Sequence, residues 1–147
     1  MSMEETTEEG YGYKLFCENY SNFSRIIDFI VKHHEKLTEE LKTSLYQAKD
    51  NDELEDELEE LLGEPAALTI AEIINQLENK EVMCGYRNCD DTDQPQMIGI
   101  MPNYPWHYHR MPQDVMTKEE CNELLNRYAE ILGITEKADY FLAHYYG

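Results

Sequence analysis

The chain has 147 residues, of which 31 are Asp or Glu and 12 are Lys or Arg, giving a formal net charge of −19. This charge disfavours direct binding to nucleic acid or to an anionic membrane, because both require clustered Lys and Arg. With 41% hydrophobic and 11% aromatic residues, the chain has enough apolar material for a core. We therefore expect a single folded domain over 1–147 rather than an acidic disordered chain.

The apolar runs are much shorter than the roughly 18 residues that indicate a membrane span. The N-terminal residues lack the basic start and the apolar run of a secretory signal. We therefore expect a cytoplasmic protein, in which the four cysteines are thiols rather than disulfides.

Residues 1–12 are polar and end in a Gly-Tyr-Gly triplet, so we expect them to form a flexible arm. From Phe23 to Ala48 the apolar residues recur at helical spacing, with no Gly or Pro to interrupt them. Two interpretations stay open. The segment forms either one long helix over about 21–50 or two helices, with Thr38 capping the second.

Two shorter helices are predicted next. Asp52 and Glu55 resemble a capping box at the start of a helix over 52–62, and a glycine follows that helix. Thr69 and Glu72 form a second capping box, which predicts a helix start at Thr69.

The pattern then changes to that of strands. Residues 82–87 and 96–101 are rich in apolar residues, and the turn-forming segment 90–95 lies between them. We expect one antiparallel hairpin over about 82–101. Residues 102–116 contain three prolines and are expected to form an extended connection.

Thr117 and Glu120 form a third capping box, and the helix that they open is predicted to end at Gly133. The apolar residues of 134–145 fit one face of a final helix. The expected fold class is therefore a helix-dominated α+β domain, with the hairpin between N-terminal and C-terminal helices.

The residues that could perform chemistry gather in and after the hairpin. Cys84 and Cys89 have C-x4-C spacing, and His107 and His109 follow them, a set of ligand types that suits zinc. In a continuous strand the two cysteines would lie on opposite faces, so we expect no metal site. The strongly negative charge also disfavours a thiolate, and Cys121 lies on an apolar helix face. A small metal-binding or thiol enzyme that uses Cys84, Cys89, His107 and His109 stays as the alternative.

The sequence lacks a phosphate-binding loop, a dinucleotide fingerprint, a zinc-protease motif and a nucleophile elbow. We therefore expect neither a catalytic residue nor a cofactor, and a protein that acts by binding rather than by catalysis.

Residues 50–64 hold nine Asp or Glu and no Lys or Arg. If the predicted helix buries its leucines, the carboxylates of its other face stand three and four residues apart. Like charges at these spacings destabilise a helix by about 0.2–0.5 kcal/mol per pair, which favours a functional reason for the row. A plain solvated surface is the alternative.

We expect the acidic row to bind a basic protein surface, most concretely as a nucleic-acid mimic that inhibits a nucleic-acid-binding protein. Some phage-encoded inhibitors of host defence nucleases act in this way. A second group of contacts is expected from aromatic residues, which are favoured at interfaces, although core packing would also explain them. The expected contact residues are Glu53, Asp56, Glu57, Glu59, Glu60, Glu64, Tyr104, Trp106 and Tyr108.

Overall fold

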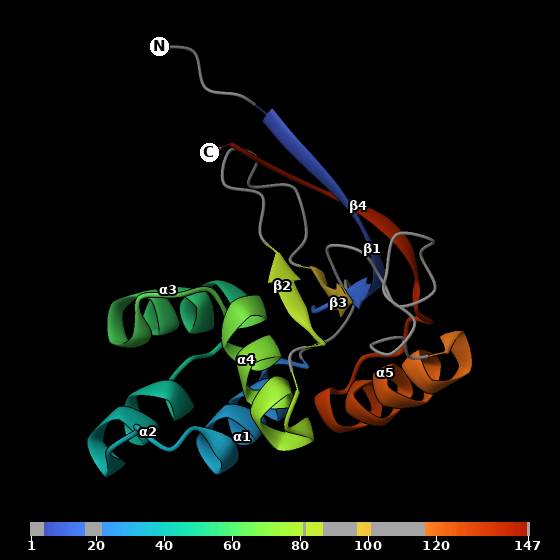
Figure 1. Cartoon of the computed structure of the whole chain (residues 1–147). Coiled ribbons are helices and arrows are strands. Elements are labelled where there is room, and N and C mark those ends of the chain that lie inside the picture. Colours follow the sequence, from blue (N-terminus) through green and yellow to red (C-terminus); the bar gives the residue numbers. More distant parts are fainter. Residues whose placement is uncertain (1–4, 17–21, 81, 87–96, 101–116, 147) are drawn as a thin grey trace.

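The computed structural model of the chain describes residues 5–16, 22–80, 82–86, 97–100 and 117–146 (Figure 1). The fold is helix-dominated α+β with an antiparallel sheet, which confirms the predicted class. In chain order the elements are β1 (Glu5–Lys14), α1 (Phe23–His33), α2 (Glu39–Tyr46), α3 (Asn51–Leu62), α4 (Ala66–Glu78), β2 (Cys84–Tyr86), β3 (Met97–Ile100), α5 (Lys118–Leu132) and β4 (Asp139–Tyr146).

The predicted hairpin is confirmed by the antiparallel pairing of β2 and β3, with Cys84 opposite Gly99 and Tyr86 opposite Met97. The sheet extends beyond this hairpin, because its strand order is β2-β3-β1-β4. β1 pairs antiparallel with both β3 and β4. The first and last strands along the chain therefore lie side by side (Figure 1).

The expectation of a flexible arm over 1–12 is wrong from residue 5 onward, where the chain forms β1. Tyr11 and Tyr13 are buried, and the Tyr13 hydroxyl donates a hydrogen bond to a backbone carbonyl of α5, 3.2 Å away. A Cβ atom at Gly12 would overlap the Ile98 backbone in β3. The glycine that suggested a loose segment instead permits a close contact between strands.

The predicted helix over 134–145 is also wrong, because Asp139–Tyr146 forms β4. β4 pairs with β1 from Glu5 opposite Tyr146 to Gly12 opposite Asp139. The apolar spacing of this segment fits a helix or a strand, and its aromatic residues favour a strand. A helix this short is marginal in water by itself, so the partner strand from the other end of the chain decides the outcome.

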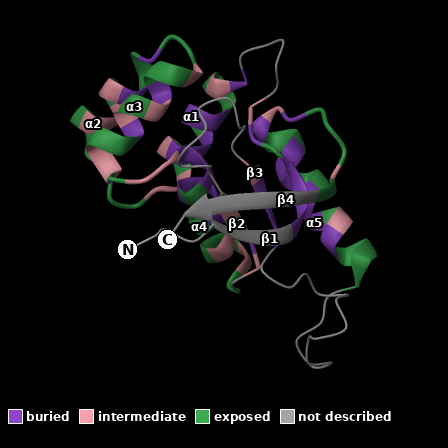
Figure 2. Ribbon diagram, turned by 90° about the horizontal axis from the view of Figure 1, so that it is seen from above, coloured by how far each residue is buried: buried purple, intermediate pink, exposed green. Residues whose placement is uncertain are grey.

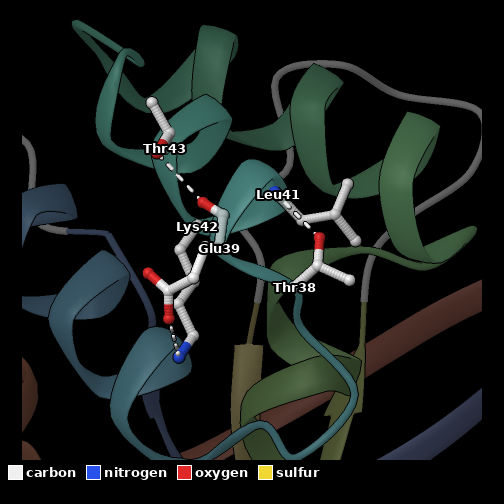
Figure 3. Close-up of polar contacts among 5 residues, drawn as sticks. All are labelled: Thr38, Glu39, Leu41, Lys42 and Thr43. Carbon is white, nitrogen blue, oxygen red and sulfur yellow. Dashed lines mark hydrogen bonds and ion pairs between the residues drawn. The ribbon is translucent and has the colours of Figure 1, made fainter.

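The alternative left open for 21–50 is resolved as two helices, α1 and α2. Thr38 caps α2, because its Oγ1 accepts a hydrogen bond from the Leu41 N–H, 3.2 Å away (Figure 3). Figure 3 also shows the ion pair between the Lys42 ammonium and the Glu39 carboxylate, which are 3.4 Å apart. The capped start lets the chain change direction, so that α2 packs against α3.

The helix start predicted at Asp52, with Glu55 as its partner, is wrong. Asp50 caps α3 instead, and its Oδ1 accepts a hydrogen bond from the Glu53 N–H at 2.8 Å. The Glu53 carboxylate in turn accepts one from the Lys49 N–H at 2.7 Å. The arrangement resembles a capping box two residues earlier than predicted, except that the Glu53 carboxylate accepts from Lys49 N–H rather than from the N–H of Asp50.

The capping box predicted at Thr69 and Glu72 is also wrong, since α4 begins at Ala66 and Thr69 lies within the helix. The Thr69 side chain is 1% exposed, with its hydroxyl 3.0 Å from the Pro65 carbonyl oxygen one turn earlier. A threonine in mid-helix satisfies its hydroxyl in this way, so the local pattern alone does not identify a cap.

Both predicted ends of the helix after the hairpin are confirmed in α5. Thr117 Oγ1 accepts a hydrogen bond from the Glu120 N–H, 3.1 Å away. Gly133 ends α5 with φ 73°, and Gly63 ends α3 with the same φ. This left-handed conformation favours glycine, which explains why these two stops are readable from the sequence.

α4 packs directly against the hairpin. A Cβ atom at Gly85 in β2 would overlap the backbone of Ala67 in α4, so the two backbones approach as only glycine allows. The Asn75 side chain accepts hydrogen bonds from the N–H groups of Val82 (3.0 Å) and Met83 (2.8 Å) and donates one to the Met83 carbonyl (2.9 Å). These contacts fix the connection from α4 to β2.

Polar contacts join α5 to the sheet and to α1. The Tyr11 hydroxyl in β1 donates to Asn122 Oδ1 at 2.6 Å. The Asn22 amide at the start of α1 donates to the carbonyls of Leu15 (2.8 Å) and Leu132 (3.3 Å). The end of β1, the start of α1 and the end of α5 therefore meet at one buried side chain.

Burial follows this arrangement. Figure 2 shows buried residues on α1, α4 and α5 and exposed residues on α2 and α3. α2 buries Leu45, whereas α3 buries Leu54 and Leu58, all three at 0% exposure. Among the helices of the described residues, none combines the length and the apolar character that crossing a membrane requires.

Candidate functional site

The acidic row predicted on α3 lies on the side away from its buried leucines. Glu53, Asp56 and Glu60 are exposed, and Glu57 is half-buried. The row follows from the helical period, because positions 53, 56, 57 and 60 share one face while positions 54 and 58 face the core. We call Glu53, Asp56, Glu57 and Glu60 the α3 row.

Within the described part of the chain, the side chains of Asp56, Glu57 and Glu60 have no hydrogen-bond or ion-pair partner. Glu53 accepts the hydrogen bond from the Lys49 backbone and so also stabilises the start of its own helix. Three carboxylates of the row therefore remain available to a cationic partner.

The row borders a hollow of about 620 Å³ between α3 and the end of α2. Glu53, Asp56 and Glu57 line one side of this hollow, and Gln47, Ala48 and Lys49 line the other. The sequence could not reveal it, because it depends on the angle between α2 and α3. Its size falls within the range of ligand sites, and the carboxylates make it suited to cationic side chains.

The two remaining acidic residues of the predicted site are placed differently. Glu59 is exposed on α3, whereas Glu64 follows Gly63 and is half-buried. The Thr69 hydroxyl donates a hydrogen bond to Glu64 Oε1, 3.2 Å away. Glu64 lines a separate cleft between α3, α4 and the α1–α2 connection, so the predicted acidic site divides into two.

Several predicted residues lie outside the described part of the chain. These are the aromatic contacts Tyr104, Trp106 and Tyr108, together with Cys89, His107 and His109 of the alternative enzyme site. Cys84 lies in β2, opposite Gly99. Among the residues that the structure describes, no group of three His, Cys, Asp or Glu side chains is placed to hold a metal ion.

Cys121 occupies a core position in α5, as predicted, with 0% exposure. Burial, and secondarily the charge of Glu120, raises the pKa of its thiol to about 11, against a smaller lowering effect of Lys80. The thiol is therefore protonated at neutral pH. Because the thiolate is the nucleophile, Cys121 is not activated for catalysis.

The separate cleft brings together residues that sequence reasoning did not connect. Glu72, which the sequence pattern placed in a helix cap, lines this cleft together with His34, Glu64 and Lys36. No local pattern in the sequence indicates this set. The break after α1 and the turn at Gly63 create it.

Comparison of the chain with protein-family models, with curated proteins and with solved structures found no significant match. The geometry and charge of these two acidic sites are therefore the basis for proposing a function.

Proposed function

We propose that this protein is a non-enzymatic interaction protein of the cytoplasm that binds a basic surface of another protein through the α3 row. Most concretely, it inhibits a nucleic-acid-binding protein by occupying the channel meant for a phosphate backbone. The single observation that carries this proposal is the shared hollow beside α3, into which Glu53, Asp56 and Glu57 bring three carboxylates.

The spacing of the row supports imitation of a phosphate backbone. From Glu53 to Glu60 an α-helix advances about 10.5 Å along its axis, so the three intervals between the four carboxylates of the row average about 3.5 Å. One strand of B-DNA carries one phosphate per about 3.4 Å of axis. Lys and Arg side chains arranged along a phosphate strand would therefore meet carboxylates at a similar axial interval on α3.

The charge balance supports the same mode of action. The net charge of −19 attracts cationic surfaces, and at physiological salt this attraction extends over about 8 Å. Charges of this kind act mainly on the rate of association. Binding is therefore expected to slow steeply as ionic strength rises from tens to hundreds of millimolar.

The test uses two charge-matched triple reversals. The first, Asp56→Lys, Glu57→Lys and Glu60→Lys, alters the α3 row. The second, Glu123→Lys, Glu130→Lys and Glu136→Lys, changes the net charge equally at exposed sites in and after α5. Circular dichroism should show that both variants keep the fold, since all six side chains lie outside the core.

Affinity capture from cell extract, with identification by mass spectrometry, would then compare wild type with both variants. We expect basic proteins that wild type captures to be lost on the row variant and kept on the control. For each captured nucleic-acid-binding protein, added wild type should displace a labelled duplex, and the row variant should fail to do so. If the row variant and the control variant capture and displace equally, the α3 row is only a solvated surface.

A further inference from the structure

The separate cleft between α3, α4 and the α1–α2 connection has a volume of about 490 Å³, within the range of small-molecule sites. Leu41, Leu61, Leu62 and Ile73 give it an apolar wall. Its polar part includes the carboxyl groups of Glu64 and Glu72. The cleft thus has the two-part character of a site for an amphipathic ligand, with one polar end and one apolar side.

The pKa of the Glu72 carboxyl group depends on its neighbour Glu64, although Glu72 as a whole residue is exposed. Burial is the main reason why the pKa of Glu72 is raised, and the charge of Glu64 and a hydrogen bond to it add to this effect. Lys36 opposes the shift but does not cancel it. Glu72 therefore keeps its proton to a higher pH than an isolated glutamate does.

The other charged groups leave the cleft negative when its carboxyl groups ionise. The α1–α2 connection contributes Glu35, Lys36 and His34, and Lys36 is the one lysine or arginine among the described residues that line the cleft. The His34 Nδ1 accepts a hydrogen bond from the Lys36 backbone N–H at 3.3 Å. Three carboxyl groups therefore face one ammonium group.

We propose that this cleft binds an alkylammonium group, with the ammonium between Glu64 and Glu72 and the carbon chain against Leu61, Leu62 and Ile73. An ammonium donates up to three hydrogen bonds and can bridge two carboxylates, and its positive charge offsets their mutual repulsion. An anion would meet repulsion here. A purely apolar ligand would take water away from the two carboxyl groups without replacing its hydrogen bonds.

Two kinds of molecule carry such an alkylammonium group, a polypeptide with a lysine side chain and a free alkyl diamine. In both, four or five methylene groups separate the ammonium from the rest of the molecule. Neither source involves the α3 row, so the inference is independent of the proposed function.

The test is isothermal titration calorimetry of the whole purified chain with two probes, 1,5-diaminopentane and Nα-acetyl-lysine amide. We expect saturable binding of one probe molecule per chain, with a dissociation constant below about 1 mM for the preferred probe. The better-bound probe identifies the source, and preference for either one supports the site.

Two properties separate this site from general attraction to an acidic protein. Titrations at a series of pH values above the ordinary pKa of a glutamate, in buffers of different ionisation enthalpy, should show a range in which binding releases a proton, because the ammonium favours the ionised form of Glu72. In a series of linear monoamines, affinity should rise with each added methylene, by up to about fourfold where the group is buried against the wall.

Glu72→Gln keeps the shape of the side chain and removes the charge, and it should weaken binding by about tenfold or more and abolish the proton release. Glu60→Gln removes an equal charge from the α3 row and should leave binding unchanged, as should the triple reversal of that row. Binding without saturation, or equal binding to Glu72→Gln and wild type, would overturn the proposal while leaving the proposed function of the α3 row intact.

Discussion

The Glu55 carboxylate in α3 accepts a hydrogen bond from the backbone N–H of Ala66, 3.2 Å away, at the first residue of α4. Pro65 occupies the N-cap position of α4 and offers no side-chain acceptor of its own. One helix therefore caps the next, and the negative charge of Glu55 also suits the positive end of the α4 dipole.

Glu55→Ala should consequently lower the free energy of unfolding by about 1–2 kcal/mol, the usual effect of removing a cap. Urea denaturation would measure it, with Glu60→Ala as the control that removes an exposed glutamate from the same helix. The control should change stability by less than about 0.5 kcal/mol. Equal effects of the two substitutions would show that Glu55 does not act as a cap.

The Asn75 side chain makes three hydrogen bonds to the backbone that leads into β2, so replacing it should lower stability. Asn75→Ala leaves two backbone donors and one acceptor without this partner and should cost about 2–3 kcal/mol of unfolding free energy. Chemical denaturation provides the value, and Gln76→Ala, an exposed neighbour in α4, is the control. A cost as small as that of the control would mean that water replaces the Asn75 contacts.

Alkaline pH should destabilise the protein. Burial raises the pKa of the Cys121 thiol from 9.0 to about 11 and that of Tyr128 from 10.0 to about 12. Both groups are neutral when protonated, so above pH 9 the unfolded chain loses protons that the folded protein keeps. The folded state then binds more protons, and its stability falls as pH rises through this window.

Melting temperatures recorded from pH 8 to pH 11 would check this direction. Cys121→Ala removes one of the two groups and should therefore show a shallower fall between pH 9 and pH 11 than wild type. A melting temperature that stays constant over this range would contradict the burial argument for both groups.

The assignment of β4 gives the last prediction. If Asp139–Tyr146 pairs with β1 as an antiparallel strand, nuclear magnetic resonance should show contacts between Cα protons at alternate cross-strand pairs of the register that contains Gly10 and Phe141. Amide protons along the ladder should also exchange slowly. Proton contacts between residues three apart within 139–146 would instead show the helix that was expected from the sequence.

Local chemistry in the sequence determined several parts of this protein. Thr117 and Glu120 cap α5, and Gly63 and Gly133 end their helices, because each of these signals is complete within a few neighbouring residues. The acidic face of α3 was predictable for the same reason, since the helical period alone separates its carboxylates from Leu54 and Leu58.

Tertiary structure decided the features that need contacts between residues far apart in the chain, namely the β1–β4 pairing and the two acidic hollows. β1 and β4 come from opposite ends of the sequence, and neither segment carries a local signal that identifies the other as its partner. The cleft with Glu64 and Glu72, and the hollow beside the α3 row, exist because three helices meet at particular angles. A strand needs the backbone hydrogen bonds of its neighbour, and a cleft needs walls from separate elements, so packing rather than local sequence determines both.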